Sequence, residues 1–352
     1  MRVLFLLEGT TVPASRFRVL QLLQAFRGIG IEPTVRFAYG DAYNRTLHTP
    51  LARPYQLATR LGRAVVGLNA GRFDAVFLQR PALPFSAIPE RLVHALNHRT
   101  IFDVDDSIFV GGDGGVAPAR LRGFQQTVQT VDQVIVGNRW LAQQAGVENK
   151  TTVIPTVVDD TRYVPSRSAT QGAPVIGWMG TMGNFPFLRQ VLPDLRTVLD
   201  RNPGVRVRLV SNATLQDVVG DARFEQVPWS AAAEIPLLQS FDIGLMPLPD
   251  NVTTRGKCAF KMIQYMAVGR PVVVSAVGAN IETFGNGQPG FLVSGEQSWV
   301  EPLQQLLDDA VLRLRCGEAG RARVESHYCI RAVMPSYQAV FAKLKADGSA
   351  KA

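Results

Sequence analysis

Short runs of apolar and β-branched residues alternate with helix-length segments along most of the chain. In the first half, these runs begin at Arg2, Pro33, Ala75, Thr100, Gln133 and Thr151. A strand buried on both faces of a parallel sheet has a continuous apolar sequence, and a helical crossover joins it to the next strand. The pattern therefore predicts a doubly wound α/β sheet.

A polar stretch rich in Pro, Gly and Ser, from Val157 to Pro174, interrupts this alternation and is typical of a linker. The alternation then resumes, with apolar runs that begin at Pro174, Val205, Arg223, Asp242, Pro271 and Gly290. We therefore expect an α/β fold of two doubly wound, Rossmann-like domains that face each other across a cleft. The predicted boundaries are 1–165 for the N-terminal domain, 166–328 for the C-terminal domain, and 329–352 for a C-terminal helix crossing back to the first domain.

Net charge and cysteine content narrow the class of protein. The formal charge of +8 favours anionic partners, and the absence of any nucleic-acid-binding motif leaves a phosphorylated substrate or an anionic membrane surface. Cys258, Cys316 and Cys329 are odd in number and have no metal-ligand spacing. This indicates a reducing cytoplasm and no metal site. The first apolar run meets Glu8 at once, so we expect a strand there and no signal peptide.

Two lysines, Lys257 and Lys261, lie one helical turn apart at the expected start of a helix, with Gln264 on the same face. Gly269 is placed to end this helix. Backbone N–H groups at a helix N-terminus carry a partial positive charge of about +0.5 and attract anions. The pattern favours a diphosphate site at the carboxyl edge of the second sheet, although a solvated charged turn is the simpler alternative.

Other candidates for the donor side also follow strands of the second half. Gly180, Thr181 and Gly183 form a glycine-rich turn whose backbone N–H groups could reach a phosphate, although such turns are often only turns. Asn212 ends the next strand, and Trp229 follows the one after, where a packing role is equally plausible.

In the first half, three carboxylates follow the strand from Thr100. Strand alternation predicts that Asp103 and Asp105 point to one face, with Asp106 next to them. They could bind substrate or a metal, or they could only cap a helix and form hydrogen bonds to arginines on the cleft side. Arg16 and Arg18 follow the first strand and are candidates for acceptor or phosphate contact.

The segment from Ala42 to Phe73 contains no acidic residue. Its five arginines could meet anionic lipid headgroups or form a solvated face; they are Arg45, Arg53, Arg60, Arg63 and Arg72.

Several motifs in order resemble the retaining glycosyltransferases of family 4, which have the GT-B fold, and bacterial polysaccharide-building members in particular. They are "TIFDVDDSIF", "FDIGLMPLPDN", "GKCAFKMIQYMAVGRPVVVSAVGAN" and "RARVESHYCIRAVMPSYQAVF". The resemblance implies that the second domain binds a UDP- or GDP-linked sugar without a metal or other cofactor. It places Val227 and Trp229 beside the base, Gln264 at the ribose and Asn280 in the donor site.

The chain departs from the family pattern in two places. Gly256 replaces the first of two glutamates, and "GTMGNF" from Gly180 replaces an Arg/Lys pair. The resemblance therefore leaves Lys257 and Lys261 to neutralise the departing diphosphate, with Asp103 as the third candidate catalytic residue. Arg16, Arg18, Asp105 and Asp106 would position the acceptor.

The function expected from these observations is metal-independent transfer of a hexose, with retention, to a glycan, glycolipid or lipid-linked acceptor. No carboxylate nucleophile is evident, so we expect front-side displacement through an oxocarbenium-like state. The enzyme would be cytoplasmic, at the inner face of the membrane. Two alternatives stay open: a sugar-nucleotide 2-epimerase of the same fold, and a non-catalytic nucleotide-sugar-binding subunit, which the loss of a glutamate at Gly256 would favour.

Overall fold

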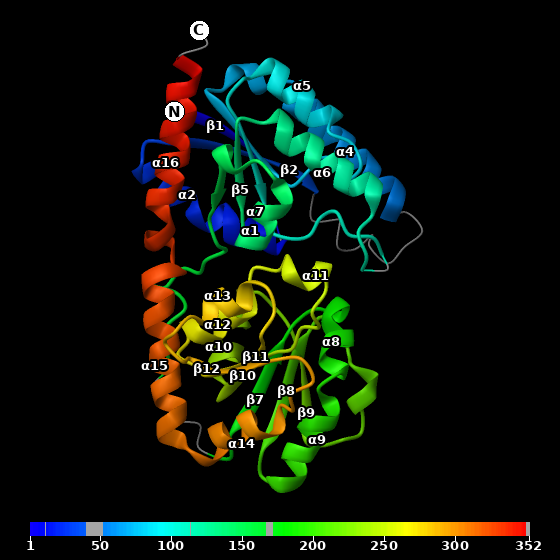
Figure 1. Ribbon diagram of the computed structural model, residues 1–352, viewed down its shortest axis with the longest axis vertical. Coiled ribbons are helices and arrows are strands. Elements are labelled where there is room, and N and C mark those ends of the chain that lie inside the picture. Colours follow the sequence, from blue (N-terminus) through cyan, green and yellow to red (C-terminus); the bar gives the residue numbers. More distant parts are fainter. Residues whose placement is uncertain (11, 40–51, 113, 167–171, 350–352) are drawn as a thin grey trace. The chain divides into compact units, whose positions relative to one another are not determined.

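The computed structural model describes residues 1–349 except 11, 40–51, 113 and 167–171. The chain divides into two compact units. The first unit comprises Met1–Val157, Gly256–Cys258 and Val333–Ala352, and the second comprises Val158–Arg255 and Ala259–Ala332. Each unit contains one parallel six-stranded sheet with helices on both faces, as Figure 1 shows.

The first sheet has the strand order β2-β1-β3-β4-β5-β6, so the direction in which strands are added reverses next to β1. Strands β3 and β4 are buried at every residue, as expected for a sheet covered on both faces. The strands are β1 (Arg2–Gly9), β2 (Glu32–Tyr39), β3 (Ala75–Gln79), β4 (Thr100–Val104), β5 (Gln133–Val136) and β6 (Thr151–Val153).

The helices of the first unit connect these strands, and the last helix of the chain packs on the same core. Phe26 stacks on Phe5, and its ring edge meets Tyr337 of α16 with the centroids 5.2 Å apart. The α-helices are α1 (Pro13–Arg18), α2 (Leu23–Gly28), α4 (Ala52–Gly67), α5 (Ile88–Leu96), α6 (Pro118–Thr130), α7 (Arg139–Ala145) and α16 (Ile330–Ser349), and the 3-10 turns are η1 (Leu20–Leu22), η2 (Ala70–Arg72) and η3 (Glu148–Lys150).

The second sheet has the order β12-β11-β10-β7-β8-β9, so its reversal lies between β7 and β10. Gly177 and Gly244 pair across these two strands, and the rings of Phe241 and Tyr265 occupy the space where Cβ atoms would stand. The strands are β7 (Val175–Met179), β8 (Arg206–Ser211), β9 (Phe224–Pro228), β10 (Ile243–Met246), β11 (Val272–Ser275) and β12 (Gly290–Val293).

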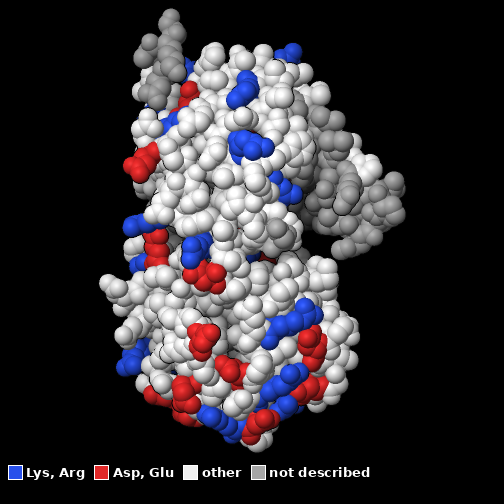
Figure 2. Space-filling view, turned by 45° about the vertical axis from the view of Figure 1, so that its right-hand side comes forward, with Lys and Arg blue, Asp and Glu red and all other residues white. Residues whose placement is uncertain are grey.

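The remaining helices belong to the second unit. The α-helices are α8 (Phe185–Arg189), α9 (Leu192–Arg201), α10 (Glu234–Gln239), α11 (Val252–Arg255), α12 (Phe260–Ala267), α13 (Ala279–Phe284), α14 (Val300–Asp308) and α15 (Ala310–His327), and the 3-10 turns are η4 (Met182–Asn184) and η5 (Gln216–Val218). Basic and acidic side chains are interspersed over the surface of this unit, as Figure 2 shows.

The fold class predicted from the sequence is confirmed, because each of the twelve predicted apolar runs contains a strand. The predicted helix from Lys257 is wrong at its start. Helix α12 begins at Phe260, because Ala259 has a left-handed backbone (φ 52°) and interrupts the turn from α11. Lys257 and Lys261 are therefore not successive residues on one helix face. Gly269, with φ 73°, follows the end of α12 as predicted.

Part of the predicted arginine-rich surface lies outside the described residues. Arg45 falls in the segment 40–51, and the side chains of Arg53, Arg60 and Arg63 are likewise not described. Among the helices that are described, none is both long enough and apolar enough to span a membrane.

Candidate functional site

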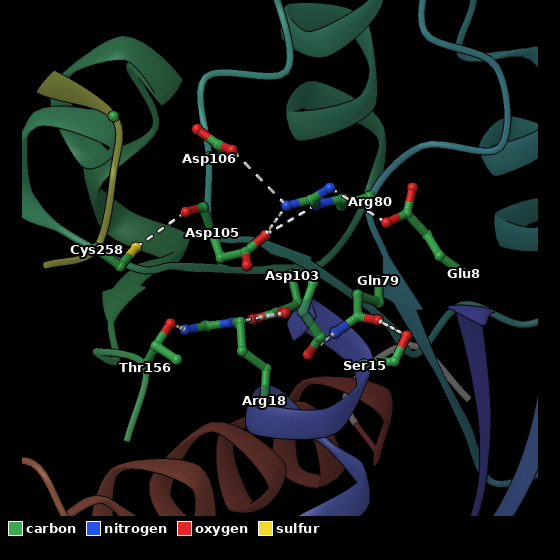
Figure 3. A network of polar contacts seen from close by, with 12 residues as sticks. Glu8, Ser15, Arg18, Gln79, Arg80, Asp103, Asp105, Asp106, Thr156 and Cys258 are labelled. Carbon is green, nitrogen blue, oxygen red and sulfur yellow. Dashed lines mark hydrogen bonds and ion pairs between the residues drawn. The ribbon is translucent and has the colours of Figure 1, made fainter. Parts of the chain in front are cut away.

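Charged side chains gather at the carboxyl edge of the first sheet, around its reversal point. Arg80 directly follows β3 and lies among three carboxylates from the ends of β1 and β4, as Figure 3 shows. Its Nε donates to Asp105 at 2.9 Å, its Nη1 lies 3.2 Å from Glu8, and its Nη2 lies 4.0 Å from Asp106. Open α/β sheets bind ligands at this kind of edge, so the cluster is a candidate ligand site.

Arg80 has an unusual backbone conformation for a non-glycine residue, with φ 57°. Burial alone would lower the pKa of its guanidinium, but the charges of Asp105, Glu8 and Asp106 outweigh burial and raise the pKa above its ordinary value. The arginine therefore stays charged and holds the carboxylates together. The side chain of Asp106 is 40% exposed and is the most open carboxylate of the cluster.

A second arginine, Arg18 at the end of α1, forms a buried ion pair with Asp103 at the end of β4. Both side chains have no exposed surface, and Arg18 Nε lies 3.0 and 2.9 Å from the two carboxylate oxygens. Arg18 also donates to Ile154 O at 3.0 Å and to Thr156 Oγ1 at 3.3 Å. Although burial opposes it, the Asp103 charge raises the pKa of Arg18.

These contacts revise two predictions about the first unit. Strand β4 ends at Val104, so alternation does not extend to Asp105, and Asp103 and Asp105 pair with different arginines (Figure 3). Asp103 and Arg18 are fully buried and have no surface with which to touch a substrate. Their charges are paired with each other instead. Arg16 is half-buried over the ring of Phe17, with 4.7 Å between its Cζ atom and the ring centroid.

The segment Gly256–Cys258 packs within the first unit at the carboxyl ends of its strands. Asn138 caps α7 through Oδ1 and donates from Nδ2 to the carbonyls of Gly256 and Lys257, both at 3.0 Å. A Cβ atom on Gly256 would stand 1.9 Å from Ser107 Oγ and 2.8 Å from Ser107 N. The glutamate expected here from the family pattern therefore has no room.

Cys258 is also fixed by this packing. Its Sγ donates to Asp105 O at 3.0 Å, and burial, followed by the charge of Asp105, raises the pKa of its thiol to about 12. The residue is a buried packing cysteine and not a nucleophile.

In the second unit, the residues predicted for the donor follow β7, β8 and β9. Thr181 begins the turn η4 after β7, and Met182 N donates to Asn212 Oδ1 at 3.1 Å, which joins the turns after β7 and β8. Thr181, Gly183 and Asn212 are exposed. Gly180 lies against the ring of Trp178, where a Cβ atom would come within 2.4 Å of a ring carbon. At this edge Thr181, Gly183 and Asn212 are therefore the accessible residues, and the ring of Trp178 fills the space beside Gly180.

Within the second unit, a chain of hydrogen bonds extends from the start of α12 to Trp229. Lys261 Nζ donates to Gln264 Oε1 at 2.8 Å, and Gln264 Nε2 donates to Tyr163 Oη at 3.0 Å. Tyr163 donates to Glu234 at 2.6 Å, and the second oxygen of Glu234 accepts from Trp229 Nε1 at 3.1 Å. The chain connects two predicted donor residues, Lys261 and Trp229, through buried polar groups.

The remaining predicted donor residues differ in how much surface they expose. Gln264 and Asn280 are buried, and Asn280 donates to Ser275 O at 2.9 Å, so both amides are engaged inside the unit. Val227 lies in β9 and pairs with Val210. Gln264 therefore positions Lys261 in this structure and has no exposed surface to offer a ribose.

A pocket of about 350 Å³ lies near the carboxyl ends of β10, β11 and β12. Its lining includes three acidic residues, Asp194, Asp250 and Glu296. Carboxylates repel a diphosphate, so this pocket is a poor place for the charged part of a nucleotide.

The sequence interpretation missed four residues of these networks: Glu8 and Arg80 in the first unit, and Tyr163 and Glu234 in the second. Glu8 and Arg80 carried a usable signal, because each stands at the carboxyl end of a predicted strand, as Asp103 does. Tyr163 lies in the predicted linker and Glu234 on a short helix, and nothing in the sequence indicates that they meet.

Two doubly wound parallel sheets in one chain define the GT-B fold of glycosyltransferases, and solved structures share it. HepE of Anabaena, crystallised with UDP, is 16% identical with a TM-score of 0.73, and the match covers 97% of this chain and 100% of that one. Sucrose-phosphate synthase of Thermosynechococcus elongatus is 15% identical with a TM-score of 0.72, covering 99% and 100%. The catalytic domain of starch synthase IV from Arabidopsis thaliana, bound to ADP and acarbose, is 9% identical with a TM-score of 0.70, covering 98% and 99%.

The sequence comparison matches part of the chain to a protein family. Residues 173–309, which carry the second sheet, match the family described as Glycosyl transferases group 1. The resemblance seen in the sequence is confirmed for this part of the chain, which is similar to group 1 glycosyltransferases, and the bacterial polysaccharide role stays a prediction. No curated protein matches the chain.

Proposed function

We propose that the protein is a retaining, metal-independent hexosyltransferase that transfers a sugar from a UDP- or GDP-linked donor to a glycan, glycolipid or lipid-linked acceptor. The observation that carries this proposal is the match of residues 173–309 to group 1 glycosyltransferases. The same region contains the exposed turns after β7 and β8 and the oriented Lys261. HepE, a structural neighbour, has also been crystallised with UDP-glucose, which supports a nucleotide-sugar donor.

In this proposal, the donor diphosphate binds at the edge of the second sheet near its reversal point. The backbone N–H groups of Thr181 and Gly183 would face the phosphate oxygens, and the ammonium of Lys261 would neutralise the leaving charge. The partly buried hydrogen bond to Gln264 orients Lys261, so little ordering is needed at the transition state. We keep Lys257 as a second phosphate contact, and Val227 and Trp229 as contacts of the base.

The acceptor side is assigned to the charged cluster of the first unit. Asp106 has the exposure needed to accept a hydrogen bond from a sugar hydroxyl, and Arg80 holds Asp105 and Glu8 beside it. We assign Arg16 to this side as well. The buried Arg18–Asp103 ion pair holds the end of β4 in place beneath the cluster and does not touch the acceptor. A front-side displacement needs no carboxylate nucleophile.

A panel of nucleotide sugars tests the activity. Incubation with UDP- and GDP-linked hexoses, with and without candidate acceptors, is expected to release free nucleoside diphosphate from one donor, measured by chromatography. Epimerised donor would show the alternative 2-epimerase, and donor binding without turnover across the panel would show a binding subunit. Either result would replace the proposal.

Metal independence is a separate prediction. In the charged cluster, the guanidinium of Arg80 occupies the position between Glu8 and Asp105 that a cation would otherwise take. We expect the initial rate of sugar transfer to change by less than about twofold on addition of EDTA, because Lys261 and the backbone N–H groups supply the positive charge. Loss of activity in EDTA, with recovery in Mn²⁺, would contradict this mechanism.

The location of the enzyme stays part of the proposal: cytoplasmic, at the inner face of the membrane. A lipid-linked acceptor would require such a position.

A further inference from the structure

Helix α5 of the first unit turns apolar side chains outward. Ile88, Leu92 and Leu96 follow one another at four-residue spacing and are 62%, 52% and 46% exposed, while Pro89, Glu90 and Val93 form the buried face. A helix on the surface of a soluble domain normally exposes its polar face. Here both the buried face and the outward face contain apolar residues.

Neighbouring elements extend this apolar surface. Phe85, just before α5, is 58% exposed, and Val65 and Leu68 at the end of α4 are 62% and 57% exposed. Helix α5 contacts both α4 and α6, and the three helices lie side by side in Figure 1. We call Val65, Leu68, Phe85, Ile88, Leu92 and Leu96 the apolar face. Exposed apolar residues gathered in this way mark an interaction surface.

Basic groups border the apolar face along α6. A shallow groove of about 440 Å³ is lined by Arg91, Arg122, Gln125, Gln126, Gln129 and Thr130. Both arginines are exposed, and within the described part of the chain neither forms an ion pair. Helix α6 has no acidic residue, and the one acid of α5, Glu90, is buried and accepts from Ala82 N. The groove therefore offers hydrogen-bond donors and positive charge to an anion.

We propose that the apolar face and the adjoining arginine groove dock on a bilayer that contains anionic lipid. The apolar side chains would enter the boundary between headgroups and acyl chains, and Arg91 and Arg122 would contact headgroup phosphates. Charge complementarity favours a membrane over a second copy of the chain. A two-fold contact through this face would set the arginines of both copies against each other without exposed acids on α5 or α6 to pair them.

This surface shares Val65 and Leu68 with the segment 42–73 singled out in the sequence, but its centre is α5 and its arginines are Arg91 and Arg122. The inference rests on the proposed function in one respect: docking on a membrane would bring the enzyme to a lipid-linked acceptor. Vesicle binding is measured without donor or acceptor, so a failure of either proposal leaves the other standing.

The experiment is co-sedimentation of the full chain with phosphatidylcholine vesicles, with and without phosphatidylglycerol, over a range of salt concentrations. We expect binding to the anionic vesicles that weakens as salt rises. The double variant Ile88→Ser/Leu92→Ser should reduce partitioning by roughly tenfold or more, because it removes two apolar side chains from the contact. Arg91→Gln/Arg122→Gln should lower it by roughly fivefold for each charge removed.

Matched controls come from the second unit. Val311 and Leu314 of α15 are 75% and 63% exposed, so Val311→Ser/Leu314→Ser removes a similar apolar surface elsewhere. Arg206→Gln/Arg315→Gln removes two exposed charges away from the groove. Both controls should bind as the parent does, and all four variants should keep the parental melting temperature.

Three outcomes would overturn the proposal. The first is a parent protein that does not bind anionic vesicles. The second is a loss of binding in the controls as large as in the α5 and groove variants. The third is a dimer, seen by sedimentation velocity, that Ile88→Ser/Leu92→Ser dissociates while vesicle binding is unchanged. The last result would assign the apolar face to a second copy of the chain.

Discussion

Replacement of Lys261 by alanine is expected to lower kcat/KM by about 10²–10³ while the protein stays folded. Charge on the leaving diphosphate grows toward the transition state, and one preorganised contact to such charge contributes a factor of this size. The loss of stability should be only about 1 kcal/mol, since the variant removes the hydrogen bond from Lys261 Nζ to Gln264 Oε1. Steady-state kinetics and thermal unfolding measure the two effects.

Binding measurements separate the proposed phosphate contact from a structural one. We expect Lys261→Ala to bind the nucleoside diphosphate more weakly and the bare nucleoside as before. Gln264→Ala, which keeps the ammonium but removes its hydrogen bond to Gln264 Oε1, should give a smaller loss of kcat/KM. Lys343→Ala is the matched control, because Lys343 also donates one bond, to Asn149 O, and lies in α16. Full activity of Lys261→Ala, or its unfolding, would assign Lys261 a structural role.

The second large effect is expected at the buried ion pair. Replacing Asp103 by leucine should lower the free energy of unfolding by about 3–5 kcal/mol, because Arg18 would be left charged in a site with no exposed surface. Arg18→Met should cost a similar amount by stranding Asp103. Urea denaturation followed by circular dichroism measures the change.

The double variant tests whether the pair itself causes this loss. Arg18→Met together with Asp103→Leu replaces both charges with apolar groups and should recover much of the stability lost by either single variant. Asp106→Asn is the control on the same strand end, since its side chain is 40% exposed, and should change stability by less than about 1 kcal/mol. Additive losses in the double variant would show that the two residues act independently.

Some properties of this protein can be predicted from its sequence because they depend on local patterns. Continuous apolar runs such as Ala75–Gln79 must be buried on both faces, which a parallel sheet with helical crossovers provides, so the fold class could be read directly. Residues at strand ends, such as Asp103, Asp105 and Asp106, could likewise be placed at a ligand edge. Hydrophobic period and strand direction are sufficient for both conclusions.

The partners of these residues depend on tertiary structure, because they come from segments far apart in the chain. Arg18 and Asp103 are 85 residues apart in the sequence. The sequence pattern predicted that both contact substrate, but their ion pair is buried. Arg80 and Glu8 are 72 residues apart, and with Asp105 and Asp106 they form a partly buried cluster that the carboxylates alone only suggested. Local composition carries no information about such distances.

The segment around Lys257 shows the same division at short range. Helical spacing predicted a single helix from Lys257, but the left-handed conformation of Ala259 starts α12 only at Phe260. Residues 256 and 257, which precede it, are held outside the helix. Gly256 packs closely on Ser107, and Asn138 donates to the carbonyls of Gly256 and Lys257. The sequence by itself determined the two sheets and their ligand edges. Packing between distant segments decided which charged side chains are buried in pairs and which stay open to a substrate.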